Sequence, residues 1–447
     1  SPPLRRRRRT TGAPRPSSCG WLAPDSDIED RMVYPMSGPS PTERPLLGLT
    51  MIVKDEAPCI RKTIDSTKGV VDVWTILDTG STDGTQQVVR GASSDAAYGA
   101  LHEEPFVDYA TSRNRALELH ESGAGPAVFA LSLSADETLV GGEALRAFLE
   151  ERRDAPDGAY CIEMRSGDKR WFYPRVLRVG AGWKYVGEVH EVPRGPNGET
   201  HGPLVPGVSI SYAATDPERH KRRVTDFDLP RLLLAAEDAT RPIEERAQAI
   251  WFLGQTYEEI AQATERTSGG PWISLKLAAM SYYWRRSEIG HEDVLKSHYA
   301  IFRYLAVGAS VGFWTLDELL VKLSAVVDME PDLAEARYLL AAYAAKKDPR
   351  EGLFFAEEAA RVSREALEAP PLQFPADTRL EWLSLEIAAN CAKEIGRGDY
   401  AKVLAERAII AGGPRDRFQA FINYVPPPPE CRAEVDPVPA EPQVAEL

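Results

Sequence analysis

Short apolar segments of strand length alternate with helical segments through the first half of the chain, and this alternation most constrains the fold. The longest apolar segments are Leu46–Val53, Val70–Leu77 and Val128–Leu133. Helical patterns occur around them, at Cys59–Lys68, Asp83–Arg90 and Tyr109–Leu119. Strands and helices in this order predict an α/β fold with a mostly parallel sheet. Three later segments predict shorter strands at a mixed edge of the sheet: Tyr160–Met164, Arg175–Val179 and Val208–Tyr212.

From about residue 216 the chain changes character, because Ala, Leu, Glu and Arg dominate and apolar residues recur at helical spacing. A tetratricopeptide-like (TPR-like) register is set by Leu253, Gly254, Tyr257, Ala279 and Tyr283. The stretch from Pro331 to Ala341 repeats it, and an insertion is expected around Thr267–Trp272. We therefore predict an all-α domain of stacked, degenerate helix pairs. Four aromatic residues are interpreted as core, with a binding stripe as the alternative: Trp272, Tyr282, Tyr283 and Trp284.

These patterns divide the 447 residues into four predicted parts. Residues 1–45 form a disordered tail rich in Arg and Pro, and 426–447 a disordered Pro-rich tail. The α/β domain occupies 46–212 and the helical domain 213–425. We expect the folded chain to be two domains joined near residue 213.

Charge and cysteine content narrow the classes of protein. A net charge of −14 argues against general polyanion binding, which needs clustered Lys and Arg. Arg5–Arg9 is interpreted as a solvated tail, with nucleic acid or acidic lipid as alternatives. Five scattered cysteines fit a reducing compartment and suggest no zinc site. No apolar run has the roughly eighteen residues of a membrane span, and no signal-peptide core follows the arginines, so we expect a cytoplasmic protein.

Acidic residues follow each of the three longest apolar segments: Asp55 and Glu56, then Asp78, then Asp136 and Glu137. In open sheets, ligands bind at the carboxyl ends of parallel strands. Acids gathered at one edge are costly unless a cation or hydrogen-bond donors neutralise them. The sequence therefore predicts Mg²⁺ or Mn²⁺ bound by one or two carboxylates together with substrate phosphates.

The segment Ile76–Thr85, ILDTGSTDGT, is a strand that ends in an acid and turns into a helix. Asp78 is placed to accept hydrogen bonds from a nucleobase or ribose, and Gly80 permits a tight turn. Asp83 is a candidate helix N-cap. The segment is not a P-loop, because no lysine follows the glycines.

Several motifs in order resemble the GT-A catalytic domain of family 2 glycosyltransferases. They are MIVKDE, ILDTGSTDGT, the helix start ATSRN at Ala110–Asn114, and LSADE. A further segment from Trp183 to Glu191, WKYVGEVHE, resembles the late His-Glu segment of a branch with a TPR-like C-terminal part. The resemblance covers Leu46 to about Tyr212. It implies a GT-A glycosyltransferase of the hexosyltransferase type, followed by helical repeats.

The resemblance also implies roles for single residues. Donor contacts would come from Glu56, Asp78, Gly80, Asp83, Arg113, Asn114 and Ser134. Metal ligands would be Asp136 and His190, and the general base would be Glu137, Glu188 or Glu191. Ser134 departs from the family pattern, which has Asp at the first position of D-x-D. Arg175 and Arg178 either face the phosphates or cap the sheet.

The implied reaction transfers a sugar from a nucleotide-sugar, with inversion and with Mn²⁺ or Mg²⁺. A UDP-sugar is expected, and GDP- and dTDP-linked donors stay open. The acceptor would be a hydroxyl or thiol on a saccharide, peptide or protein, with a modified nucleic acid base as a remote option. The alternative, favoured by Ser134, is a catalytically degenerate scaffold that binds partners through its repeats. A nucleotidyltransferase would need a Gly-rich basic loop at the first strand, which LTMIVKDEAP lacks.

Overall fold

The computed structural model describes residues 44–92, 98–123, 125–212, 216–265, 270–289, 294–368 and 376–425. The tails predicted at 1–45 and 426–447 lie outside these residues, apart from Arg44 and Pro45. Half of the expected insertion, residues 267–269, also lies outside them.

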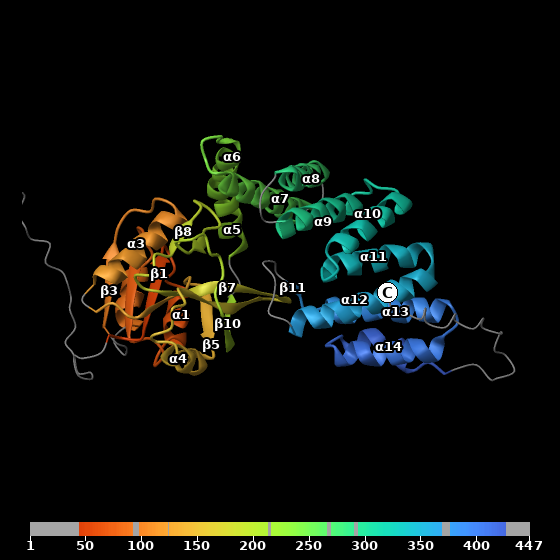
Figure 1. Ribbon diagram of the computed structural model, residues 1–447, viewed down its shortest axis with the longest axis horizontal. Helices are drawn as coiled ribbons and strands as arrows, with labels where there is room; N and C mark the ends of the chain where they lie inside the picture. The colour runs from red at the N-terminus through yellow and green to blue at the C-terminus, as the bar shows by residue number, and fades with distance from the viewer. Residues whose placement is uncertain are drawn as a thin grey trace, which may run out of the picture.

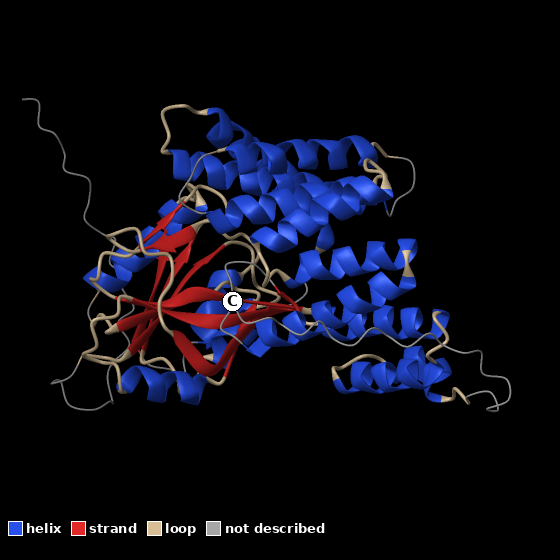
Figure 2. Ribbon diagram, turned by 45° about the vertical axis from the view of Figure 1, so that its right-hand side comes forward, coloured by secondary structure: helices blue, strands red, loops and turns tan. Residues whose placement is uncertain are grey.

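A mixed β-sheet occupies the first half (Figure 2). Its main strands are β1 (Leu47–Val53), β2 (Val73–Asp78), β3 (Tyr98–Glu103), β4 (Phe129–Ser132), β5 (Glu137–Val140), β6 (Ala159–Ser166), β7 (Lys169–Arg178) and β10 (Leu204–Tyr212). Their order is β3-β2-β1-β4-β7-β6-β10-β5. The first four are parallel, whereas β7 is antiparallel to both β4 and β6. The expected α/β class with a mixed sheet is confirmed.

Helices pack on the sheet because its central strands are apolar on both faces. Every residue of β2 is buried, as is β4. The helices of this half are α1 (Ile60–Ser66), α2 (Thr85–Ala92), α3 (Tyr109–Ser122) and α4 (Gly142–Glu150). α3 packs against β1 and β2. Gly48 allows this approach, since a Cβ there would lie 2.3 Å from the His120 ring.

The second half is a stack of helices, as expected (Figure 1). They are α5 (Pro217–Arg223), α6 (Leu229–Glu237), α7 (Ile243–Glu265), α8 (Trp272–Glu288), α9 (Val294–Ser310), α10 (Leu316–Met329), α11 (Ala334–Lys347), α12 (Pro349–Glu368), α13 (Leu380–Glu394), α14 (Gly398–Ile410) and α15 (Arg415–Ile422). A short π-helix, η2 (Val224–Asp228), joins α5 to α6. Consecutive helices pack against each other from α6 to α15.

The TPR-like register corresponds to close packing of α7 on α8. A Cβ on Gly254 would lie 2.6 Å from the Tyr283 ring, so only glycine permits this contact without rearrangement. Ala279 and Tyr283 are fully buried. Of the aromatic residues assigned to the core, Tyr283 lies there, whereas Trp284 is 46% exposed.

The helices contact the sheet half at several places, including the following two. At one, Val189 packs with Leu232, Ala249 and Leu253 in a shared apolar cluster. At the other, the two-residue strand β11 (Ala376–Asp377), which the sequence did not predict, pairs antiparallel with the start of β7. No helix within the described residues is both long and apolar enough to cross a membrane.

Candidate functional site

β1, β2 and β4, the three strands with acidic residues at or just after their carboxyl ends, are direct neighbours in the sheet. β1 lies between β2 and β4 and is parallel to both. Val53 pairs with Asp78, and Thr50 pairs with Ser132. The segments that follow β1 and β4 therefore leave the sheet at the edge where Asp78 ends β2. This common edge is the one that the sequence predicted.

Asp78 is fully buried at this edge and is only half satisfied. Its Oδ1 accepts hydrogen bonds from the backbone N–H groups of Gly80 (2.8 Å) and Ser81 (2.7 Å). No described residue donates to its buried Oδ2. Gly80 has φ of 104°, which supports the tight turn expected there. A buried polar atom without a partner is costly, and a donor group on a ligand would remove that cost.

Two other acids of these loops bind protein groups. The Oδ1 of Asp55 accepts a hydrogen bond from Thr82 N (2.7 Å). Asp83 accepts from Ala57 N (3.0 Å) through Oδ2 and from the Thr85 N–H and hydroxyl through Oδ1. Both aspartates thus join the loop after β1 to the loop after β2. The structure places Asp83 in this framework, two residues before the start of α2 at Thr85.

Glu56 is held by an arginine that the sequence analysis did not single out. Arg219 of α5 places Nη2 2.6 Å from Oε1 and Nη1 3.1 Å from Oε2 of this glutamate. The same guanidinium donates to the carbonyl oxygens of Lys54 (2.8 Å) and Asp55 (3.1 Å). The hydrogen bond to Glu56 raises the pKa of Arg219 above its ordinary value. Glu56, a proposed donor contact, is therefore bound to α5, the first helix after the sheet.

The neighbouring acids Asp136 and Glu137 have opposite surroundings. Glu137 is fully buried, accepts from Arg175 Nη2 (2.6 Å) and accepts from the backbone N–H of Ser134 (2.7 Å). Asp136 is partly exposed and has no ion pair or hydrogen bond with any other described residue. Burial, and next the charge of Glu137, raise the pKa of Asp136. Asp136 is therefore the carboxylate of this turn that can accept a cation.

Arg113 reaches the same edge from α3. Its Nε donates to Glu191 Oε1 at 2.5 Å, and its two terminal nitrogens donate to the hydroxyls of Ser132 (3.2 Å) and Ser134 (3.1 Å). Burial acts to lower the pKa of Arg113, but the charges of Glu191 and Tyr185 and the hydrogen bond to Glu191 together outweigh it, and the pKa is raised. Ser134 therefore stands beside a cation, in the position where the family pattern has an acid.

Asn114 fixes a hairpin to α3. The hairpin consists of β8 (Lys184–Val186) and β9 (Val192–Arg194). The Asn114 side chain donates to Tyr185 O (2.8 Å) and accepts from Tyr185 N (2.7 Å). Both polar ends of the amide are thus occupied by the backbone. This holds the loop of residues 187–191, GEVHE, next to Arg113.

The remaining predicted residues of this loop face the helices. Glu188 forms ion pairs with Arg241 and with Arg231, the latter at 3.9 Å. The His190 ring stacks on Phe252 of α7 with centroids 4.0 Å apart. Burial, and next the charge of Arg223, lower the pKa of His190 to about 4, so its imidazole is neutral at pH 7.

Asp136 and His190 are the predicted metal ligands. Among the described residues, no group of three or more His, Cys, Asp or Glu side chains is arranged to hold a metal ion. The charged groups that shift the pKa of His190 are Arg223, Glu191 and His220, and Asp136 is not one of them. A Mg²⁺ or Mn²⁺ ion that binds one carboxylate, water and substrate phosphates needs only Asp136 from the protein.

Arg175 and Arg178 bind partners that are distant in sequence. Arg175 bonds Glu137 and the Tyr212 hydroxyl (3.2 Å), and it is buried. Arg178 instead donates to the carbonyl oxygens of Asp157 (3.0 Å) and Arg153 (2.8 Å), away from the acids. The only sequence signal for Arg219 was its place in the basic run ERHKRR.

Comparisons with known proteins add distant likenesses. No family model matches the chain. A TPR repeat-containing protein of Synechococcus elongatus is 34% identical over 121 residues, which are 27% of this chain and 27% of that protein. The chain thus spans about a quarter of the length of that curated relative. A solved structure of a mannosyltransferase from Pyrobaculum calidifontis, in complex with GDP-Man and Mn²⁺, has 18% identity and a TM-score of 0.33, over 69% of this chain and 86% of that one. A likeness this distant does not extend to donor, metal or acceptor.

Proposed function

We propose that this chain is a glycosyltransferase that uses a nucleotide-sugar donor at the edge formed by β1, β2 and β4. The observation that supports it most is Asp78, a fully buried carboxylate with one oxygen that no described residue satisfies. Nucleobases and riboses present the N–H and O–H donors that such an oxygen accepts. The motifs that resemble family 2 enzymes meet at this same edge.

Asp136 is the proposed protein ligand of a divalent cation. Its carboxylate is free of protein partners among the described residues, and burial, followed by the charge of Glu137, raises its pKa. When bound, Mn²⁺ or Mg²⁺ would supply Lewis-acid stabilisation of the leaving diphosphate. Glu137 would position this turn, because it ties Ser134 N to Arg175. His190 remains a proposed second ligand through its neutral imidazole.

Arg113 is the proposed diphosphate contact. Its planar guanidinium suits phosphate oxygens and already lies 3.1 Å from the Ser134 hydroxyl in the turn that precedes Asp136. Charge that develops on the leaving group would be stabilised by this fixed cation. Glu56, Gly80, Asp83 and Asn114 shape the surrounding loops.

Glu191 is the carboxylate that we propose as general base. Of the three candidates, Glu137 has both oxygens engaged and Glu188 faces Arg231 and Arg241. Glu191 binds Arg113 through Oε1, and no described residue hydrogen-bonds its Oε2. A diphosphate that competes for the Arg113 guanidinium would weaken this pair and free the Glu191 carboxylate for the acceptor hydroxyl. Proton removal from the acceptor would then accompany a direct, inverting displacement.

The test is a thermal-shift titration with UDP, GDP and dTDP, each with and without Mn²⁺. A ligand at about a hundred times its Kd stabilises the folded state by roughly 2.7 kcal/mol. We expect one diphosphate to raise Tm in a metal-dependent manner, and that diphosphate names the donor class. Asp136→Asn should remove the metal dependence, while the exposed Asp65→Asn serves as the matched control.

A scaffold that binds partners only through its helices is the competing function. Its specific support is the occupation of Glu56 by Arg219 and the serine at position 134. It predicts no Tm shift with any of the three diphosphates. That result would end the glycosyltransferase proposal.

A further inference from the structure

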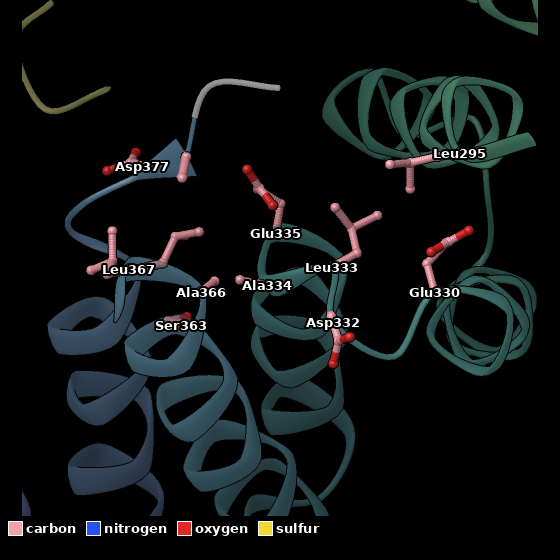
Figure 3. A pocket seen from close by; sticks show the side chains of 12 residues that line it. Leu295, Glu330, Asp332, Leu333, Ala334, Glu335, Ser363, Ala366, Leu367 and Asp377 are labelled. Atoms are coloured by element: carbon pink, nitrogen blue, oxygen red, sulfur yellow. The ribbon is translucent and has the colours of Figure 1, made fainter. Parts of the chain in front are cut away.

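A small pocket, partly open to solvent, lies in the helical stack beside β11. It is formed by the starts of α9 and α11, the end of α12 and the segment of β11 with the start of α13 (Figure 3). Its walls are apolar and include Leu295, Leu333, Leu367 and Leu380. An apolar lining with a few polar groups is typical of sites that bind a side chain or small ligand.

The polar groups of this pocket are acidic. The described lining residues include four carboxylates and no Lys or Arg: Glu330, Asp332, Glu335 and Asp377. One of them is neutralised, because Asp377 pairs with Arg379 (2.7 Å), and Glu330 lies 2.7 Å from Nδ1 of His298. The pocket therefore has an excess of negative charge that its own lining does not balance.

Glu335 lacks a partner among the described residues, as does Asp332, and Glu335 is the less exposed of the two. It forms no ion pair or side-chain hydrogen bond with another described residue. Figure 3 shows its carboxylate projecting into the pocket between Leu333 and Asp377. Burial raises the pKa of Glu335, and Asp377 adds to the shift against the charges of Arg303 and Lys169. An acid in such surroundings is stabilised by a cation that brings its own apolar stem.

The sheet register sets the distance from this pocket to the acidic edge. β6 pairs with one side of β7 along its length. β4 and β11 therefore both pair with the other side of β7. β4 pairs with Val176–Arg178 and β11 with Lys169 and Arg170, which leaves residues 171–175 between them. Six residue steps along a strand span about 20 Å. An extended peptide of about six residues covers the same distance.

We infer that this pocket anchors an arginine or lysine side chain of a polypeptide acceptor, about six residues from the residue that receives the sugar. The pocket supplies Glu335 for the charged end and leucines for the methylene stem. The length of β7 between β11 and β4 sets the distance to the turn of Asp136. This inference rests on the proposed function for the transfer step, but the anchor is a binding property that can be measured alone.

The experiment is fluorescence anisotropy with a labelled nonapeptide of Ala, Ser and Leu that contains one central arginine. A second probe replaces the arginine by citrulline, which keeps the shape and removes the charge. We expect the Kd of the citrulline probe to be higher by about tenfold or more, because this probe loses a charge-assisted hydrogen bond. Glu335→Gln should weaken the arginine probe by a similar factor and leave the citrulline probe unchanged.

The matched control is Glu351→Gln, an exposed acid in the first turn of α12 that does not line the pocket. Equal binding of the two probes to the wild type would overturn the anchor, as would an equal loss in Glu335→Gln and Glu351→Gln. Spermidine that displaces the probe at the same concentration would assign the pocket to small polyamines instead. Peptide binding without any nucleotide binding would leave the anchor standing and reject the glycosyltransferase function.

Discussion

Arg113 of α3 and Glu191 of the β8–β9 loop are joined at the acidic edge by a bond of 2.5 Å between Nε and Oε1. The arginine also contacts Ser134, and the next residue of the loop toward the N-terminus, His190, stacks on α7. The position of this guanidinium is therefore linked to the turn of Asp136 on one side and to the helical half on the other.

Glu191→Gln should reduce turnover strongly and change nucleotide binding little. The amide keeps an acceptor for Arg113 but cannot take a proton, and loss of a general base typically lowers kcat by about 10² to 10⁴-fold. The measurement compares kcat with the Kd of the nucleoside diphosphate. Glu188→Gln, whose carboxylate faces Arg231 and Arg241, is the control. Turnover at the wild-type rate in Glu191→Gln would move the base elsewhere.

Asp78→Asn should abolish nucleotide binding while leaving the fold intact. The asparagine oxygen can still accept from Gly80 N and Ser81 N, whereas its amide replaces the acceptor Oδ2 by a donor. Calorimetric titration with the preferred diphosphate measures the effect, and circular dichroism checks the fold. Binding within a factor of two of the wild type would contradict the role given to Asp78.

Gly254→Ala should destabilise the helical half. The new Cβ would lie 2.6 Å from the Tyr283 ring, which is fully buried and cannot swing away. Overpacking of this kind costs about 1–3 kcal/mol. Gly91→Ala is the control, because a Cβ there meets nothing within 4 Å and a helical alanine gains about 0.5–1 kcal/mol over glycine. Unchanged thermal stability in Gly254→Ala would show that the α7–α8 contact is looser than described.

His120 should make the sheet half sensitive to acid. Ala127 N donates to its Nε2 (3.3 Å), and Nδ1 lies 3.0 Å from the Thr75 hydroxyl, so the folded ring is neutral. Burial lowers its pKa to about 4, whereas an unfolded histidine has a pKa of about 6.5. Its contribution is complete above pH 6.5 and is lost as pH falls toward 4, by roughly 2 kcal/mol between pH 7 and pH 5.

Urea unfolding at pH 7 and pH 5 measures this dependence. His120→Gln should lose less stability than the wild type over the same interval, since the glutamine does not titrate. An equal loss in both proteins would assign the acid sensitivity to other groups.

The sequence predicted the acidic edge because its causes are local. Apolar segments that end in acids specify both a buried strand and the residue at its tip, and three such segments sufficed to place Asp78, Asp136 and the loop of Glu56 together. Gly80 was predicted for the same reason, since a tight turn after a strand needs its positive φ. β3 was missed because YGALHE lacks an apolar run, and β11 because two residues show no period.

The partners of the predicted residues could not be read from the sequence. Arg219 and Glu56 are separated by 163 positions, and Arg175 and Glu137 by 38, so their pairing depends on tertiary packing. The residue types alone do not reveal that Asn114 holds the Tyr185 backbone or that Glu188 faces α6 and its following turn.

The most direct test of the central claim is the metal-dependent release of nucleoside diphosphate from UDP-, GDP- and dTDP-linked sugars, with and without an acceptor peptide. The account predicts release from one donor class, dependent on Mn²⁺ or Mg²⁺, and its loss in Asp136→Ala with an unchanged melting temperature. Undiminished release in Asp136→Ala, or no release from any donor by the wild type, would contradict it.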